Sequence, residues 1–192
     1  MDILSIQKSK LREDLLTLYF TNPEKKYYLR ELERIINHSV GNIRRELNKL
    51  EDAGLFLREN KGNQVYYYLN KSFPLFDELK SIIFKTSGVP QLLRNALASL
   101  KDKDIGYAFI YGSFAKKEER EDSDIDLLII GEVNEDEMIK KINKLEKRLQ
   151  REINYSIYSK EEFQTQKEKR NPFIMDVIEG ESIFLIGNEN EL

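Results

Sequence analysis

The segment FIYGSFAKKEEREDSDIDLLII, residues 109–130, decides how the second half of this chain folds. It places Asp124 and Asp126 at the start of one apolar run, and a Gly-Ser pair after an earlier one. A β-strand points alternate side chains to one face, so the two aspartates project together. Two carboxylates at that spacing repel each other unless a cation neutralises them. The segment therefore predicts a cation site at the mouth of a buried strand.

The composition restricts the kind of cation. The 192 residues include no cysteine and one histidine, which disfavours a thiolate or histidine-based metal site. Carboxylate oxygens on a rigid strand suit Mg²⁺ or Mn²⁺, which complete their coordination with water and nucleotide phosphates. Upstream, Gly112 allows close approach of a ligand to the backbone, and the Ser113 hydroxyl would face a phosphate. Ten residues separate Ser113 from Asp124, enough for the chain to leave the sheet and return on the neighbouring strand.

These residues carry a family resemblance. The positions concerned are Tyr111, Gly112, Ser113, Ala115 and the run SDIDL at 123–127. Together they resemble the motif of the DNA polymerase beta nucleotidyltransferase superfamily, and over about residues 90–188 the chain looks like its small "minimal" members. The resemblance implies that Asp124 and Asp126 bind the metal ions that hold a nucleoside triphosphate. Those ions would stabilise an in-line displacement at its α-phosphorus.

The loop that follows Ser113 is strongly charged. Lys116, Lys117 and Arg120 would add positive charge to the phosphate site, and Lys116 joins Gly112 and Ser113 as an expected nucleotide contact. The alternative is a solvated loop, balanced by three glutamates between 118 and 121. Lys117 also stands where many relatives have glycine, which departs from the family's pattern.

A second departure concerns the third acid of the family. Its catalytic members place a third carboxylate on a neighbouring strand, where it completes the metal site and helps to deprotonate the attacking hydroxyl. Here that strand is EINYSIYS (152–159), and Asn154 takes the position. An asparagine can coordinate a metal through its carbonyl, but it takes up no proton at neutral pH. Glu152 lies on the same face as Asn154 but about 7 Å from it along the strand. We therefore expect impaired catalysis at a site that still binds Mg²⁺ or Mn²⁺ with a nucleoside triphosphate.

The second half as a whole alternates helical and extended patterns. Helices are expected at 91–102, 134–150, 161–170 and 171–180, and strands at 105–112, 123–131, 152–159 and 181–187. This alternation predicts an α/β domain with a small mixed sheet flanked by helices. Its expected bounds are 90–192, since Ser, Gly and Pro cluster just before it.

The first half predicts three helices followed by a β-hairpin. The expected helices are 8–22, 28–37 and 40–53, and the hairpin turns around 60–63. Asn37-His38-Ser39 supplies a short break between the last two helices. This order resembles a winged helix-turn-helix domain, which we place at 1–72. The fold class is thus a two-domain α+β and α/β chain.

The resemblance implies that the third helix contacts DNA in the major groove. Its outward side chains, with a wing at the hairpin, are the expected DNA-binding residues: Ser39, Asn42, Arg44, Arg45, Asn48, Arg58 and Lys61. Arginine and asparagine suit bidentate contacts to base edges. The alternative is that the domain binds protein and that the arginines are simply solvated.

Residues 73–89 are expected to form a connecting helix and linker. The apolar stripe of that helix, at Phe76, Leu79 and Ile83, would pack on either domain or on a second copy in a homodimer. Residues 1–85 carry 15 basic against 12 acidic side chains, and residues 86–192 carry 16 against 22. A basic half suits an anionic polymer and an acidic half suits a cation. The apolar runs are far too short to span a bilayer, which predicts a cytoplasmic protein without a membrane partner.

Two functions remain open from the sequence. The first is a DNA-binding, regulator-like protein whose second domain binds a metal–nucleotide complex. The alternative is an active metal-dependent nucleotidyltransferase that moves NMP to a protein, a small molecule or a nucleic acid, including antitoxin-like modification of a partner protein. The two functions differ mainly in whether a site with Asn154 in place of the third carboxylate can catalyse the transfer.

Overall fold

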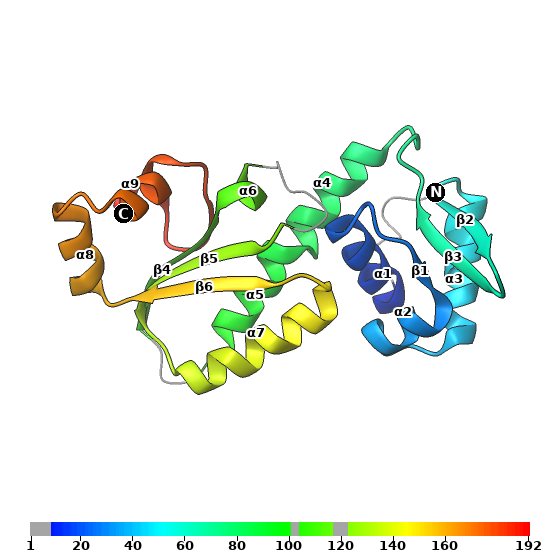
Figure 1. Cartoon of the computed structure of the whole chain (residues 1–192), viewed down its shortest axis with the longest axis horizontal. Helices are drawn as coiled ribbons and strands as arrows, with labels where there is room; N and C mark the ends of the chain where they lie inside the picture. The colour runs from blue at the N-terminus through cyan, green and yellow to red at the C-terminus, as the bar shows by residue number, and fades with distance from the viewer. Residues whose placement is uncertain (1–8, 101–103, 117–122) are drawn as a thin grey trace. The chain divides into compact units, whose positions relative to one another are not determined.

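The computed structural model describes residues 9–100, 104–116 and 123–192. The chain divides into two compact units, Met1–Val89 with Arg148–Gln150, and Pro90–Lys147 with Arg151–Leu192. Each unit has its own β-sheet (Figure 1). None of the described helices is both long and apolar enough to cross a membrane.

The first unit begins with three helices. They are α1 (Lys10–Thr21), α2 (Leu29–Ile36) and α3 (Val40–Asp52). Ser9 caps α1, because its hydroxyl accepts a hydrogen bond from the Arg12 backbone N–H at 3.4 Å. Asn37 ends α2 in the left-handed conformation with φ 53°, which asparagine tolerates better than most residues. The predicted break between the second and third helices is therefore confirmed.

A three-stranded antiparallel sheet completes the first unit. Its strands are β1 (Tyr27–Tyr28), β2 (Phe56–Lys61) and β3 (Gln64–Leu69), in the order β1-β3-β2. Lys61 pairs with Gln64, so Gly62 and Asn63 form the turn, with Gly62 at φ 61°. The predicted hairpin is confirmed, and so is the second helix, which begins at Leu29, one residue after its predicted start. Strand β1, in which Tyr28 pairs with Tyr66, was not predicted, because two residues are too few to show a periodic pattern.

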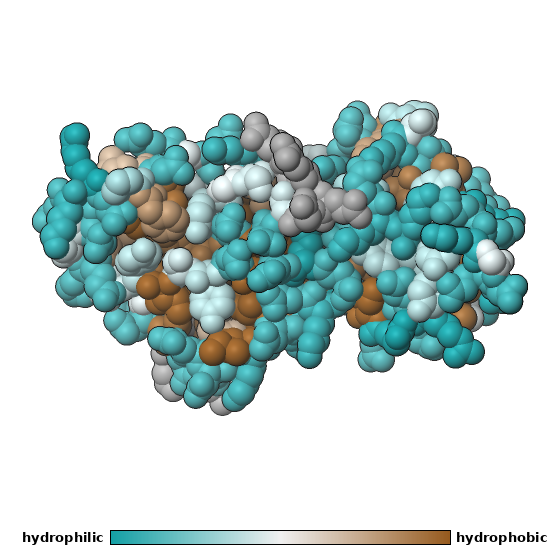
Figure 2. Space-filling model, viewed as in Figure 1, coloured by the Kyte–Doolittle hydropathy of each residue, from teal (hydrophilic) through white to brown (hydrophobic). Residues whose placement is uncertain are grey.

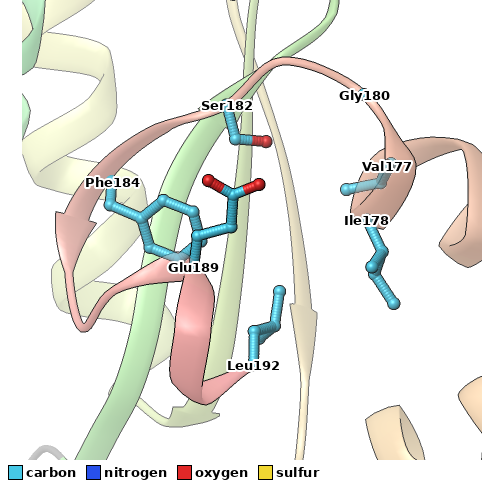
Figure 3. Close-up of a pocket in the computed structure, with 7 residues that line it drawn as sticks. All are labelled: Val177, Ile178, Gly180, Ser182, Phe184, Glu189 and Leu192. Carbon is cyan, nitrogen blue, oxygen red and sulfur yellow. The ribbon is translucent and has the colours of Figure 1, made fainter.

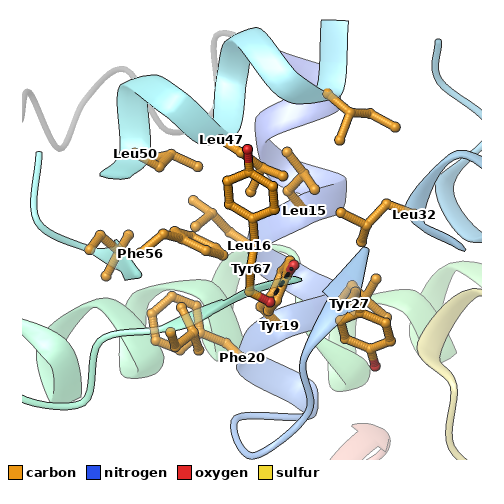
Figure 4. Packing of buried hydrophobic residues seen from close by; sticks show 14 of the residues in the cluster. Leu15, Leu16, Tyr19, Phe20, Tyr27, Leu32, Leu47, Leu50, Phe56 and Tyr67 are labelled. Atoms are coloured by element: carbon orange, nitrogen blue, oxygen red, sulfur yellow. Dashed lines mark hydrogen bonds between the residues drawn. The ribbon is translucent and has the colours of Figure 1, made fainter. Parts of the chain in front are cut away.

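Aromatic rings tie the first helix to this sheet (Figure 4). The ring of Tyr19 meets Tyr27 at 5.2 Å and Phe56 at 4.7 Å, both edge-on. Its buried hydroxyl donates to the backbone carbonyl of Tyr67 at 3.1 Å, so the polar group is satisfied inside the core. This burial raises the pKa of Tyr19 well above its usual range.

Helix α4 (Phe76–Thr86) belongs to the same core. Leu79 and Ile83 are each 1% exposed within it, and the ring of Phe76 lies 5.4 Å from that of Phe20 on α1. The apolar stripe is thus covered inside the first unit. It leaves no argument for a homodimer at this helix.

The second unit contains a four-stranded mixed sheet. Its strands are β4 (Asp104–Tyr111), β5 (Ile125–Glu132), β6 (Ile153–Tyr158) and β7 (Ile183–Ile186). Their order is β6-β5-β4-β7, with β5 and β6 parallel and the other pairs antiparallel. The remaining elements are α5 (Val89–Ala98), α6 (Gly112–Ala115), α7 (Glu135–Leu149), α8 (Lys160–Glu168), α9 (Pro172–Glu179) and the 3₁₀ turn η2 (Glu189–Glu191). The predicted mixed sheet flanked by helices is confirmed.

The two faces of this sheet are covered differently (Figure 1). Helices α5 and α7 lie along one face. On the other face, Phe109 and Leu128 pack in one cluster with Ile174 and Val177 of α9. Phe109 and Leu128 are register partners, so side chains two residues away on β4 and β5 share the α9 face. That face is the one to which Asp126 belongs.

Candidate functional site

One row of side chains crosses three strands at the edge of this face. In the register, Tyr111 of β4 lies opposite Asp126 of β5, and Asp126 lies beside Asn154 of β6. The parallel pairing of β5 with β6 thus puts an amide where a third carboxylate would stand. Asp124 immediately precedes β5 and is half-buried like Asp126.

The two aspartates form an electrostatically unfavourable pair. Partial burial, followed by the negative charge of Asp124, raises the pKa of Asp126. A hydrogen bond from the side chain of Asn154 acts in the opposite direction and lowers that pKa. The amide Nδ2 of Asn154 also lies 3.1 Å from Oδ2 of Asp124, to which it donates. Asn154 therefore favours the charged form of Asp126 and holds the carboxylate of Asp124 in place.

Gly112 makes the approach to Asp126 possible. It begins the one-turn helix α6 with φ 73°, and a Cβ at this position would come within 2.6 Å of Oδ2 of Asp126. Ser113 follows it and is half-buried, whereas Lys116 at the end of α6 is exposed. The backbone N–H of Lys116 donates to the Gly112 carbonyl at 3.2 Å, which closes the turn. Lys117 and Arg120, also predicted near the phosphate, lie outside the described residues.

The sequence did not predict two residues near the aspartates as site residues. The side chain of Ser156 on β6 hydrogen-bonds Tyr111, whose pKa is raised by burial and then by Asp126. The ring of Phe173 lies 5.8 Å from that of Tyr111 at 76°. The alternation of β6 was a signal for Ser156, which lies two residues after Asn154 on the same face. No local pattern pointed to Phe173.

Arg151 fixes the strand that carries the aspartates. It is 6% exposed, and its guanidinium donates to the backbone carbonyl of Ser123, just before Asp124. In the same stretch, the N–H of Ile125 donates to the Glu152 carbonyl at 3.0 Å. The side chain of Glu152 itself is exposed. Glu152 thus serves the site through its backbone.

The residues present fit a magnesium ion. Mg²⁺ binds through one or two carboxylates together with water and substrate phosphates, and Asp124 and Asp126 supply two. Partial burial and then the charge of Asp124 raise the pKa of Asp126, and a divalent cation bound there would favour the charged carboxylate instead. Across residues 9–100, 104–116 and 123–192, no group of three or more His, Cys or acidic side chains could hold a metal by itself. Such a two-carboxylate site relies on phosphate oxygens to complete the coordination.

The predicted nucleic-acid contacts of the first unit lie at α3 and on strand β2. The helix buries Ile43, Leu47 and Leu50, and six of the seven predicted contact residues are exposed away from any acidic partner in the described chain: Ser39, Asn42, Arg44, Arg45, Asn48 and Lys61. Arg58 differs, because its Nε lies 3.1 Å from a carboxylate oxygen of Glu51.

A separate small pocket lies at the carboxyl end of the chain (Figure 3). Val177, Phe184 and Leu192 give it apolar walls and Glu189 a carboxylate. Its volume of about 40 Å³ is enough for one or two waters. None of the metal-site residues lines it.

A comparison with known protein families matches the second unit. Residues 95–185 match the model of the family described as Polymerase beta, Nucleotidyltransferase. The second unit carries a nucleotidyltransferase-fold domain. This match confirms that part of the predicted resemblance, while the winged-helix assignment of the first unit stays a prediction.

The other comparisons add little. No curated protein matches the chain significantly. One similar solved structure is described as "Crystal structure of the toxin-antitoxin with AMP-PNP". It aligns at 12% identity with a TM-score of 0.38, over 53% of this chain and 76% of that one. A likeness at that score carries no argument for this protein.

Proposed function

We propose that the second unit is a metal-dependent nucleotidyltransferase that uses a nucleoside triphosphate and transfers NMP to an acceptor hydroxyl. The observation that carries the proposal is the placement of Gly112, Asp124 and Asp126 within a segment that matches the nucleotidyltransferase family. Glycine at 112 leaves room for the carboxylate of Asp126, and the alternation around β5 aligns that carboxylate with Asp124.

Each residue of the site has a chemical task in this proposal. Asp124 and Asp126 would hold Mg²⁺, which when bound neutralises charge on the phosphates and on the departing pyrophosphate. Ser113 and the adjoining backbone N–H groups would hold the phosphate chain, with Lys116 adding positive charge. Asn154 orients Asp124 through the 3.1 Å hydrogen bond but accepts no proton from the acceptor. We therefore expect transfer to be slow.

The experiment follows the label of an α-³²P nucleoside triphosphate in the presence of Mg²⁺, with the purified chain and with cell extract as a source of acceptors. Transfer by the wild type should be abolished in Asp124→Ala. Asn154→Asp should increase it about ten-fold or more, because a third carboxylate supplies the missing base. Glu152→Gln is the matched control and should have no effect. Absence of transfer in both the wild type and Asn154→Asp would refute the proposal.

A second function concerns the first unit: we propose that the α3 face binds DNA as part of a winged helix. The supporting observation is that Arg44 and Arg45 are both exposed and face no acidic partner among the described residues. Arginines available in this way can neutralise phosphates or read guanine edges.

The test is a salt titration of binding to mixed duplex DNA. Arg44→Ala/Arg45→Ala should weaken binding and lower the slope of log K against log[salt] by about two, since each phosphate contact contributes about 0.9. Lys85→Ala, which removes an exposed cation on α4, is the control and should change neither the affinity for DNA nor the salt slope. An unchanged salt slope in the double variant would exclude α3 as the contact face.

A further inference from the structure

Phe173 presents an exposed aromatic ring next to the metal site. It lies in the first turn of α9 and is 39% exposed, whereas Ile174 and Val177 of the same helix are 1% and 3% exposed. The two buried residues anchor the helix, and part of the Phe173 ring stays open to solvent. Figure 2 shows hydrophobic surface open to solvent in the region of α9 and the adjoining strands.

The local sequence holds this ring in one place. Pro172 occupies the start of α9, where its fixed φ suits the first helical turn. The side chain of Asn171 accepts hydrogen bonds from the backbone N–H groups of Phe173 at 3.0 Å and Ile174 at 3.4 Å. A capped helix start of this kind leaves the Phe173 backbone little freedom.

Tyr111 connects this ring to the carboxylates. Its ring packs against Phe173 at 5.8 Å and 76°, and its backbone lies opposite Asp126 in the β4–β5 ladder. The Ser156 hydrogen bond restrains its phenol, and the charge of Asp126 is close enough to raise its pKa. An aromatic pair therefore begins at the metal site and ends at solvent. A nucleotide with its phosphates at Asp126 has its base one sugar away from them, within reach of such a pair.

We propose that Phe173 and Tyr111 form the nucleobase subsite of this domain, in which the base of the nucleotide stacks on the exposed ring of Phe173. The inference rests on the proposed function, because it takes the phosphates to lie at Asp124 and Asp126. Stacking uses the π-face common to all bases, so the subsite accepts any of the four bases and favours the larger purines. The pocket beside Glu189 is no competitor, because none of the residues that line it belongs to the metal site.

The test separates the base from the phosphates by using two probes, Mg²⁺–ATP and Mg²⁺–tripolyphosphate, in calorimetric titrations of the full chain. Phe173→Ala should weaken ATP about ten-fold, which corresponds to about 1.4 kcal/mol, and leave tripolyphosphate unchanged. Phe173→Tyr keeps an aromatic face and should bind ATP like the wild type. Ile139→Ala, which truncates another exposed apolar residue of the second unit, should change neither affinity.

The other outcomes discriminate clearly. Unchanged ATP affinity in Phe173→Ala overturns the subsite while the proposed function stands, and a loss of transfer alone would assign the ring to the acceptor instead. Equal weakening of both probes overturns it as well, because Phe173 would then only support the fold. A wild type that binds neither probe refutes the proposed function itself, and the subsite with it.

Discussion

Replacement of Gly112 by alanine tests whether the backbone and the carboxylate at this site are built for one another. The residue has φ 73°, a conformation that costs a non-glycine residue about 1–2 kcal/mol. The new Cβ would lie 2.6 Å from Oδ2 of Asp126, so the carboxylate must leave its rotamer at a further cost of about 0.5–1.5 kcal/mol. We expect Gly112→Ala to lower the free energy of unfolding of the second unit by about 1.5–3.5 kcal/mol.

The assay combines urea denaturation with titration of Mg²⁺–ATP. Gly62→Ala is the matched control, because Gly62 has φ 61° but nothing within 4 Å of its Cβ position, so it should cost only the conformational part, about 1–2 kcal/mol. Gly112→Ala should also weaken Mg²⁺–ATP binding, since the displaced carboxylate no longer faces Asp124. Gly62→Ala should leave that affinity unchanged.

A double-mutant cycle isolates the contact. If the methyl group collides with the carboxylate, Gly112→Ala should cost about 1 kcal/mol less in an Asp126→Ala background, because the collision partner is gone. Strict additivity of the two substitutions would refute the reasoning. So would wild-type stability and nucleotide affinity in Gly112→Ala alone.

Three further predictions concern charge and packing. The pKa of Asp126 is raised in the folded protein, so the folded state binds the proton of this carboxyl group more tightly than the unfolded state does. In EDTA, the contribution of Asp126 to stability should therefore be full below the unfolded-state pKa. It should be lost as the pH rises through the folded-state pKa. Asp126→Asn should remove that slope and stabilise the metal-free protein at pH 7 in thermal unfolding. Leu79→Ala should destabilise the first unit by about 2–4 kcal/mol in urea, whereas Leu75→Ala, which truncates a leucine that is 42% exposed, should cost under about 0.5 kcal/mol. Tyr19→Phe removes the buried hydrogen bond to the Tyr67 carbonyl and should cost about 1 kcal/mol in the same assay.

The parts of this fold that the sequence predicts are those governed by a local period. The alternation around Asp124 and Asp126 predicts their common face, and Gly62 with Asn63 predicts the turn of the hairpin. Strand β1 could not be predicted in this way, because two tyrosines make no pattern and their strand exists only through its pairing with Tyr66 and Tyr67. The sequence predicts the apolar stripe of α4 but not the core against which it packs, because periodicity shows that a helix face is buried without showing which elements bury it.

The candidate site likewise contains residues that the sequence predicts and residues that it does not. Asn154 follows from strand alternation together with the family resemblance, because both depend on positions along the chain. The contact between Tyr111 and Phe173 depends on where α9 lies on the sheet, more than sixty residues later in the sequence. A short stretch of sequence does not predict such a tertiary contact, so the sequence alone shows Phe173 only as one more apolar residue of a helix.

Asn154 bears on both the stability and the chemistry of the site. A third carboxylate beside Asp124 and Asp126 would add like charge to a pair in which burial and repulsion already raise one pKa. The amide instead donates a 3.1 Å hydrogen bond to Asp124 and opposes the rise in the pKa of Asp126, so it offsets part of the repulsion without a metal. The same substitution withdraws the group that would accept the proton of an acceptor hydroxyl. The weaker repulsion in the metal-free site and the slow transfer that we propose therefore have one cause, and in that proposal the acceptor loses its proton to a group other than residue 154.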